Sequence, residues 1–404
     1  MIDIDNKQRL FRPQEITLLI VSILSMMAGA IITPALTEIK LEFHGDDEIF
    51  ILLILTLPGL TTALFSPLFG ILIDKYGRIR ILVFCLFLYG VSGSSGFIFN
   101  QLNFILLGRA FLGISVGGIM TICSTLIGDY YNGRLRDKMI GLQYGLMTFS
   151  NFIFLILGGI LADFTWRLNF ITYLISFLLI PFVLMYLPEI NVESLFNSKN
   201  FEIISFKRNI KTIIYSYSLG FLVTSSLYFI YIQIPFYLNS KFQSTPGEIG
   251  IALSVLALSS AVVSITYRNI SSKFHSNFVF CLSFIILGLG NLGLSFITDY
   301  NLIIACLFIF GIGLGLFVPT IMKYLFTAIQ REHRGKVISG YTTIIFLATF
   351  LSPIISNPIV KFYGILQLFA ISGYIMVAVS LIYFFSIIQI NKKGLFNIKS
   401  FKKN

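Results

Sequence analysis

The fold is decided by the stretch Gly70-Ile71-Leu72-Ile73-Asp74-Lys75-Tyr76-Gly77-Arg78-Ile79-Arg80, which lies between two long apolar runs. These runs, residues 51–69 and 81–99, each approach the ~20 apolar residues that a helix needs to cross a bilayer. Because the stretch between them is short, we expect a tight hairpin. Its turn would hold a carboxylate, three cations and two glycines, which allow the backbone to reverse sharply.

The composition places the whole chain in a membrane. Of its 404 residues, 56% are hydrophobic and only 12% are charged, which excludes an ordinary soluble domain. The four cysteines sit singly inside apolar runs, and the three histidines lie far apart in loops. We therefore expect a protein that crosses the membrane many times, with no disulfide, no metal centre and no cofactor.

Twelve apolar runs are long enough to be membrane spans. They cover residues 16–36, 49–69, 81–99, 103–127, 140–162, 168–187, 212–236, 248–267, 277–297, 302–325, 337–360 and 365–389. An even number of spans puts both termini on the same side of the membrane. The sequence therefore predicts an all-α membrane protein.

The net charge of +11 is unevenly distributed between the two sides. Lysines and arginines gather in the segments on the side of the termini, at 7–12, 75–80, 134–138, 199–211, 268–273, 323–336 and 392–403. The other side carries Lys40, Arg167, Lys241 and Lys361. Since Lys and Arg mark cytoplasmic loops, we expect both termini in the cytoplasm and a location in the plasma (bacterial inner) membrane. The basicity is a topology signal and does not indicate nucleic-acid binding, although the tail lysines can also contact anionic lipid.

The two halves of the chain echo each other. Residues 136–141, before the fifth span, resemble residues 334–340, before the eleventh, and at the same offset Gly113 and Gly117 correspond to Gly311 and Gly315. We expect a six-helix bundle at 1–187, a cytoplasmic linker at 188–211, a second six-helix bundle at 212–390 and a basic tail at 391–404.

The pattern Gly-x-Leu-x-Asp-x-x-Gly-Arg-x-Arg resembles the loop between the second and third helices of major facilitator superfamily transporters. The resemblance implies two pseudo-symmetric six-helix bundles that move around a central substrate site. It also implies a gating role for the loop charges, with Asp129, at the end of the fourth span, as a partner. This expected gate consists of Gly70, Asp74, Gly77, Arg78, Arg80 and Asp129. Solvated loop charges without such a role are the alternative.

Arg109 is the only charge deep inside a span of the first half, where a buried guanidinium is costly. With Gly113 and Gly117 it resembles the fourth-helix motif of the same superfamily, which implies a role in proton coupling. Two alternatives stay open. The arginine can simply be bound to backbone carbonyls or a neighbouring helix, and the glycines can serve close helix packing.

Two features bear on the direction of transport and on the charge of the substrate. Trp166-Arg167-x-x-Phe170 fits the drug-efflux branch of the superfamily, and the fifth-helix signature of antiporters is present only as Gly158-Gly159. No Asp or Glu lies in the middle third of any span, unlike many drug/proton antiporters of the family. This absence disfavours cationic drugs. An aromatic, weakly polar cavity with one buried cation would suit a neutral or anionic amphipathic compound.

The substrate cavity is predicted from helical spacing. Tyrosines and a threonine of the seventh span recur three and four residues apart, so they share one face. Polar residues of the fifth and eleventh spans complete the set. The expected cavity residues are Gln143, Asn151, Tyr217, Thr224, Ser225, Tyr228, Tyr231 and Tyr341. The alternative for each is a hydrogen bond that only joins neighbouring helices.

These expectations combine into one functional hypothesis, a monomeric secondary transporter that exports a drug or an anionic metabolite or chelator in exchange for protons. An uptake symporter or uniporter of a small metabolite is the alternative within transport. A transporter-like receptor or a structural membrane protein is the alternative of another class. An enzyme is not expected, because no cluster of His, Cys or carboxylates shares one depth.

Overall fold

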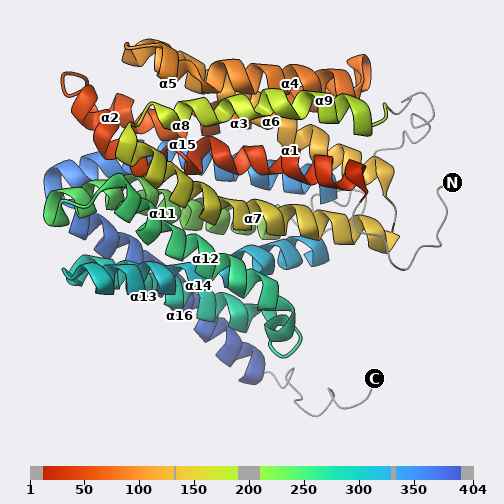
Figure 1. Cartoon of the computed structure of the whole chain (residues 1–404). Helices are drawn as coiled ribbons and strands as arrows, with labels where there is room; N and C mark the ends of the chain where they lie inside the picture. Colours follow the sequence, from red (N-terminus) through yellow and green to blue (C-terminus); the bar gives the residue numbers. More distant parts are fainter. Residues whose placement is uncertain (1–11, 132, 190–209, 329–333, 393–404) are drawn as a thin grey trace.

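The structure, a computed structural model, describes residues 12–131, 133–189, 210–328 and 334–392 (Figure 1). These residues form helices and connecting segments without a strand. Twelve helices among them are long and apolar enough to cross a membrane, which confirms the twelve predicted spans. Most of the predicted linker (190–209) and of the predicted tail (393–404) lies outside the described residues.

The first six spans are built from nine α-helices and two 3-10 turns. The α-helices are α1 (Pro13–Ala30), α2 (Leu36–Glu42), α3 (Glu48–Tyr76), α4 (Arg78–Gly93), α5 (Ser95–Ile98), α6 (Leu102–Tyr130), α7 (Gly133–Phe164), α8 (Leu168–Ile171) and α9 (Ile175–Tyr186). The turns are η1 (Thr33–Ala35) and η2 (Thr172–Leu174). Span one is α1 continued by η1 and α2, and span six joins α8, η2 and α9.

The second six spans are single helices. They are α11 (Ile210–Phe242), α12 (Pro246–Ser271), α13 (Ser276–Phe296), α14 (Tyr300–Ala328), α15 (Arg334–Tyr363) and α16 (Ile365–Lys392). Each is longer than the ~20 residues that a helix needs to cross a bilayer. In lipid a helix satisfies all the backbone hydrogen bonds of the segment that it spans.

The hairpin between the second and third spans is tighter than expected. Helix α3 continues to Tyr76 and α4 starts at Arg78, so Gly77 alone makes the turn, with φ at 90°. Glycine adopts this backbone conformation without strain. Gly70 lies inside α3, and a Cβ atom there would meet nothing within 4 Å. The expectation that both glycines form the turn was therefore wrong, because helix α3 continues beyond the end of the apolar run.

The helices form two bundles of six. One hydrophobic cluster of buried side chains comes entirely from the first six spans. A second comes from α11 to α16, joined by five residues of the first bundle: Ala30, Leu36, Leu52, Leu55 and Leu155. The main contacts between the bundles are α7 along α12 and α3 along α15. The bundles therefore meet along a seam of four long helices.

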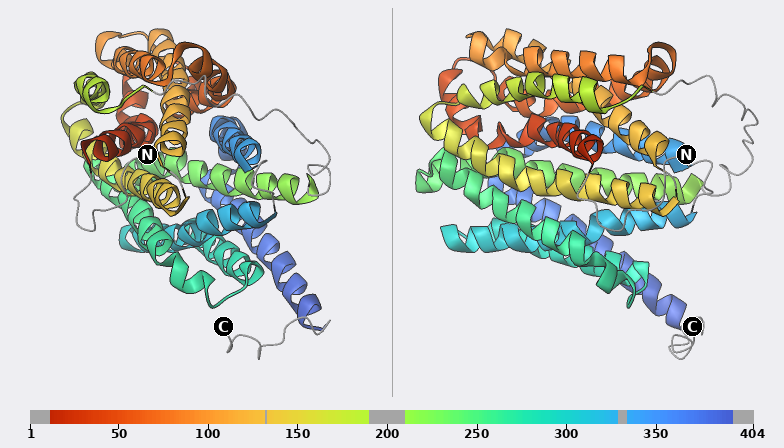
Figure 2. Two further views of the ribbon diagram at one scale, coloured as in Figure 1. Left: turned by 90° about the vertical axis from the view of Figure 1, so that its right-hand side faces the viewer. Right: turned by 45° about the vertical axis from the view of Figure 1, so that its right-hand side comes forward.

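Two opposite faces of the molecule matter for function. Helix α1 begins and α16 ends at one face, called here the terminal face, where the α3–α4 and α6–α7 turns also lie (Figures 1 and 2). The α11–α12 connection and α2 lie at the opposite end, called here the far face (Figure 1). This arrangement agrees with an even number of spans.

Candidate functional site

At the terminal face, the expected gate contains a buried ion pair. Arg78, the first residue of α4, pairs with Asp129 near the end of α6, and only 5% of the arginine side chain and 15% of the aspartate side chain are exposed. Arg80 is exposed. The side chain of Asp74 lies outside what the structure describes, although its backbone continues α3. The structure thus brings two of the expected gate residues together.

Glu189 is a third member of this cluster that the sequence analysis missed. Its two carboxylate oxygens accept hydrogen bonds from the backbone N–H groups of Arg78 (2.6 Å) and Ile79 (3.0 Å). These are among the first N–H groups of α4, which have no partner within the helix. A Cβ atom on Gly77 would lie 3.1 Å from the Glu189 carboxyl carbon, so glycine also makes room for this cap.

In the interior of the first bundle, Arg109 is completely buried and joins four spans. From α6, its Nε donates to the carbonyl of Ile54 in α3 at 2.6 Å, and one terminal nitrogen donates to the hydroxyl of Tyr173 in η2 at 2.8 Å. The other terminal nitrogen donates to the carbonyl of Ala28 in α1. No carboxylate is among these partners. This is the carbonyl-bound arginine of the alternative hypothesis, and its role in coupling stays a prediction.

Gly113 and Gly117 let α6 reach these partners. A Cβ atom on Gly113 would lie 2.2 Å from the carbonyl oxygen of Pro58, and one on Gly117 would lie 2.8 Å from the Ser66 hydroxyl. Both contacts are with α3, so the glycines allow the two helices to pack closely. The same close approach puts the Ile54 carbonyl within reach of Arg109. Their structural role is therefore to position the arginine.

Tyr173 and Tyr89 form an aromatic pair beside Arg109 that the sequence analysis also missed. The Tyr173 hydroxyl donates to the Ala28 carbonyl at 2.9 Å, and its ring lies 5.5 Å from that of Tyr89. Tyr89 donates to the Leu24 carbonyl at 2.7 Å. A tyrosine inside a membrane span needs a hydrogen-bond partner for its hydroxyl. That need could have identified both residues from the sequence.

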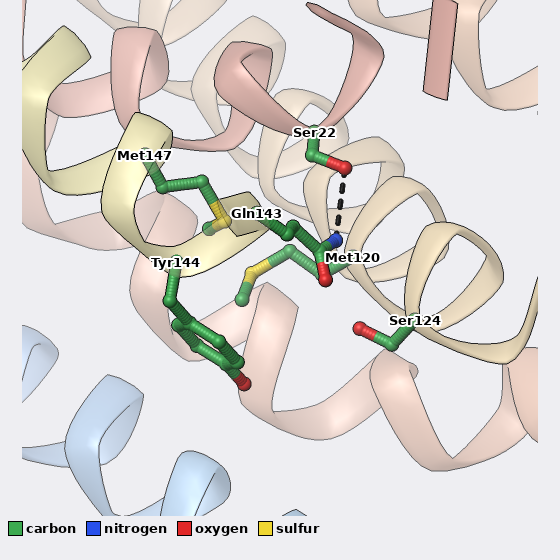
Figure 3. A pocket seen from close by; sticks show the side chains of 6 residues that line it. All are labelled: Ser22, Met120, Ser124, Gln143, Tyr144 and Met147. Carbon is green, nitrogen blue, oxygen red and sulfur yellow. Dashed lines mark hydrogen bonds between the residues drawn. The ribbon is translucent and has the colours of Figure 1, made fainter. Parts of the chain in front are cut away.

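A small pocket lies between α1, α6 and α7 (Figure 3). It is lined by Ser22, Met120, Ser124, Gln143, Tyr144 and Met147. The Gln143 amide nitrogen donates to the Ser22 hydroxyl at 2.8 Å. Gln143 was expected in the cavity and Met147 shares its helical stripe, while Met120 and the two serines come from spans that the expected set did not include.

Other expected cavity residues lie where the two bundles meet. Asn151 of α7 donates to the hydroxyl of Tyr231 in α11 at 2.9 Å, a direct hydrogen bond between the bundles. The rings of Tyr228 and Tyr231 are 5.8 Å apart. Tyr228 and Tyr231 thus form a central aromatic face where the two bundles meet.

The remaining expected cavity residues lie within the second bundle. The Tyr217 hydroxyl donates to the Val337 carbonyl at 2.7 Å, and its ring is 6.1 Å from that of Tyr341. Ser225 is buried and Thr224 half-buried on α11. Tyr217 and Tyr341 thus join α11 to α15, as the alternative hypothesis stated, and a cavity shared by the eight residues stays a prediction.

The seam between the bundles is closed at the far face. A Cβ atom on Gly159 of α7 would lie 2.6 Å from the carbonyl oxygen of Pro246, and one on Gly250 would lie 2.5 Å from that of Leu155. The Asp163 carboxylate accepts a hydrogen bond from the Gly247 N–H at 2.8 Å, close to the start of α12. At the same face, the Lys40 ammonium lies 4.9 Å from the ring centroid of Phe236.

The terminal-face half of α7 is much less crowded. Cβ atoms on Gly141 and Gly145 would meet nothing within 4 Å, and Tyr144 is 46% exposed. The same helix is thus tightly enclosed near the far face and open near the terminal face. The close glycine contacts of α7 with α12 are therefore those near the far face.

The structure also bears on metal binding. Across residues 12–131, 133–189, 210–328 and 334–392, no group of three or more His, Cys, Asp or Glu side chains could hold a metal ion. The four cysteines are free.

Comparison with known proteins gives one family and a consistent set of relatives. The family model described as Major Facilitator Superfamily matches residues 18–237 and again residues 217–399. The chain is 24% identical to a class H tetracycline resistance protein of Pasteurella multocida, over 84% of this chain and 87% of that protein. It is 25% identical to a bacillibactin exporter of Bacillus subtilis, over 74% of this chain and 78% of that protein.

A solved structure supports the same fold. The crystal structure of the nucleoside transporter NupG superposes with a TM-score of 0.72, covering 92% of this chain and 98% of that one, at 15% sequence identity.

Proposed function

This chain belongs to the Major Facilitator Superfamily, and on that premise we propose that it exports a small amphipathic organic compound in exchange for protons. It is a multi-pass membrane transporter by family and by its twelve apolar helices. Two relatives that match most of the chain carry export or resistance in their names, which supports export as the direction. We propose that it works as a monomer in the cytoplasmic membrane.

The observation that carries the proposal is the close packing of α7 against α12 near the far face. In transporters built from two such halves, the substrate site is exposed to one side of the membrane at a time as the halves rock. Here Gly159 and Gly250 pack closely near the far face, while Gly141 and Gly145 have no such contact near the terminal face. With the termini in the cytoplasm, as the excess of Lys and Arg on that side supports, the less crowded end of α7 would face the inside.

We assign the gate to Arg78, Asp129 and Glu189 at the terminal face, with Asp74, Gly70, Gly77 and Arg80 of the same motif. The buried Arg78–Asp129 pair and the Glu189 cap hold the start of α4 against the end of α6. Both contacts lie within the first bundle, so they position the motif on that bundle.

We assign the coupling role to Arg109. A guanidinium does not release its proton in proteins, so Arg109 cannot carry the transported proton itself. It acts instead through its charge, which is fully buried in the first bundle, whereas the aromatic face formed by Tyr228 and Tyr231 lies where the two bundles meet. A fixed positive charge there favours the deprotonated form of an acidic substrate and disfavours a cation. Asn151 completes this central face across the seam.

The test is proton release from inside-out vesicles that contain the protein and a preformed acidic interior. We expect tetracycline, a quinolone or bacillibactin to dissipate the gradient when added outside, and the lipophilic cation ethidium to have no effect. Vesicles without the protein are the control. If no member of this panel, extended with nucleosides and anionic metabolites, ever releases protons, proton-coupled export is wrong.

A further inference from the structure

We infer that Asp163 is a latch between the two bundles, a carboxylate of the first bundle that caps the start of a helix in the second. The inference rests on the proposed function, because a latch has a role only where the bundles rock. It assigns to one side chain a preference for the arrangement in which the far-face ends of α7 and α12 lie together. This preference follows from the place of Asp163 on its own helix and from the group that it binds on the other.

Asp163 lies at an unfavourable place on its own helix. It belongs to the last turn of α7, which ends at Phe164 and has no basic residue in that turn. The C-terminal end of a helix bears a partial negative charge, so a carboxylate there is repelled by the helix to which it belongs. The residue is also exposed, so packing in the interior of the first bundle does not explain it.

The start of α12 offers a hydrogen-bond donor that Asp163 accepts. The first N–H groups of a helix have no partner within that helix. In α12 the first residue, Pro246, has no N–H, and the N–H of the third, Glu248, donates to the Thr245 hydroxyl at 3.3 Å. The N–H of the second residue, Gly247, donates to Oδ1 of Asp163 at 2.8 Å. Within this first turn, the first bundle thus supplies the one acceptor that the capping residue does not.

Gly247 makes room for this contact. A Cβ atom there would overlap Oδ2 of Asp163, so a larger residue would push the carboxylate away from the backbone. With glycine in place, the positive end of α12 attracts the charge that the negative end of α7 repels. The position of Asp163 is therefore favourable only while the two helix ends lie together.

The contact differs between the two arrangements of a rocking transporter. When the far-face ends of α7 and α12 separate, Asp163 and the Gly247 N–H exchange their shared hydrogen bond for bonds with water. The carboxylate then keeps only its unfavourable interaction with α7. A contact that one state makes and the other lacks shifts the equilibrium between them. For one carboxylate at an exposed helix N-terminus, the expected shift is about two- to fivefold.

The rate at which the far-face half of the seam opens tests the latch. Leu155 of α7 is completely buried and packs in the cluster formed mainly by the second bundle, so a cysteine there should react only when the bundles separate. Right-side-out vesicles that contain the full-length Leu155→Cys protein are treated with a membrane-impermeant maleimide. We expect the added change Asp163→Ala to make modification of position 155 about two- to fivefold faster. Mass spectrometry of the peptide that contains position 155 separates this signal from the four native cysteines.

Three further variants make the test specific. Gly247→Ala should also accelerate the modification, since its methyl group displaces the carboxylate. Asp163→Ala combined with Gly247→Ala should be no faster than the faster of the two single variants, because both changes remove the same contact. The matched control is Glu248→Ala. It removes a carboxylate that accepts from the Thr245 N–H at 3.2 Å within the second bundle, so it should leave the rate unchanged.

An unchanged rate in Asp163→Ala from both sides of the membrane overturns the inference, and so does an equal acceleration in Glu248→Ala. Additive effects of Asp163→Ala and Gly247→Ala would exclude the direct contact. Inside-out vesicles treated in the same way report the other side. Acceleration from that side alone would support the latch and refute the cytoplasmic position of the termini. No substrate or proton gradient is used, so failure of the latch is distinct from failure of proton-coupled export.

Discussion

Replacement of Arg109 by methionine should lower transport at least 100-fold while the protein still inserts and folds. Methionine keeps most of the volume and removes the charge and the three hydrogen bonds to Ile54, Ala28 and Tyr173. The two carbonyls belong to helices α3 and α1, whose backbone bonds remain, so the fold should survive. Transport in inside-out vesicles, normalised to the amount of folded protein, measures the effect.

Arg109→Lys separates charge from geometry. Lysine restores the positive charge as a compact ammonium, but it lacks the planar fork that serves several partners at once. We expect it to recover part of the transport. The matched control is Lys241→Met, which removes an exposed cation at the end of α11 and should change transport less than twofold. Full transport by Arg109→Met would exclude the coupling role and would favour the receptor or structural alternative.

Breaking the Arg78–Asp129 pair should have the second-largest effect. In Asp129→Asn the buried guanidinium of Arg78 loses its charged partner, and removing one member of a buried pair typically costs about 3–5 kcal/mol. Because the pair joins α4 to α6 at the gate, we expect both a lower melting temperature and at least tenfold slower transport. Thermal unfolding in detergent and vesicle transport are the two measurements.

An exposed ion pair of the same bundle is the control for that experiment. Lys40 and Glu48 pair while their side chains are 42% and 39% exposed, and exposed pairs contribute about 0–1 kcal/mol. Glu48→Gln should therefore leave stability nearly unchanged. The charge exchange of Arg78→Asp with Asp129→Arg should restore only part of what Asp129→Asn loses, because the carboxylate introduced at position 78 would face that of Glu189. Equal losses in the buried and exposed pairs would contradict the gate.

The sequence was sufficient for the architecture because the bilayer constrains it so strongly. Apolar runs of sufficient length must be helices in lipid, so twelve spans could be predicted without any contact information. The extent of the α3–α4 turn could not, since a helix can continue through charged residues once it leaves the apolar region. That is why Lys75 and Tyr76 belong to α3 and Gly77 alone turns the chain.

The sequence predicts the candidate site well where burial of one charged side chain has a high energetic cost. Elsewhere it predicts the site only approximately. A lone arginine inside a span demands partners, and Arg109 indeed has three. The acceptors that bind its guanidinium could not be predicted, because every residue has a backbone carbonyl and the sequence does not show which one lies nearby. Glu189 was missed for a related reason. It lies between a span and a polar segment, where an acidic residue does not stand out from its neighbours.

The substrate cavity is the part that is hardest to derive from the sequence. Helical spacing identifies residues that share a face of one helix, but it does not identify the helix they face. Tyr217 and Tyr341 therefore turned out to join α11 to α15, whereas Asn151 and Tyr231 bond across the two bundles. Met120 and Ser22 lie in the pocket with Gln143 although the three residues come from three different spans.

The most direct test of alternating closure is a pair of label distances measured in the unaltered protein and in Gly159→Val. Valine at this position would press on the Pro246 carbonyl and force the far face of the seam apart. Spin labels at Phe164 and Phe242 report on the far face, and labels at Tyr76 and Phe274 report on the terminal face.

We expect Gly159→Val to lengthen the far-face distance and shorten the terminal-face distance, because the bundles rock as rigid bodies. The control, Gly141→Val, makes the same change in open space on the same helix and should leave both distances unchanged. Two distances that stay constant in Gly159→Val, or that lengthen together, would contradict alternating access in this protein.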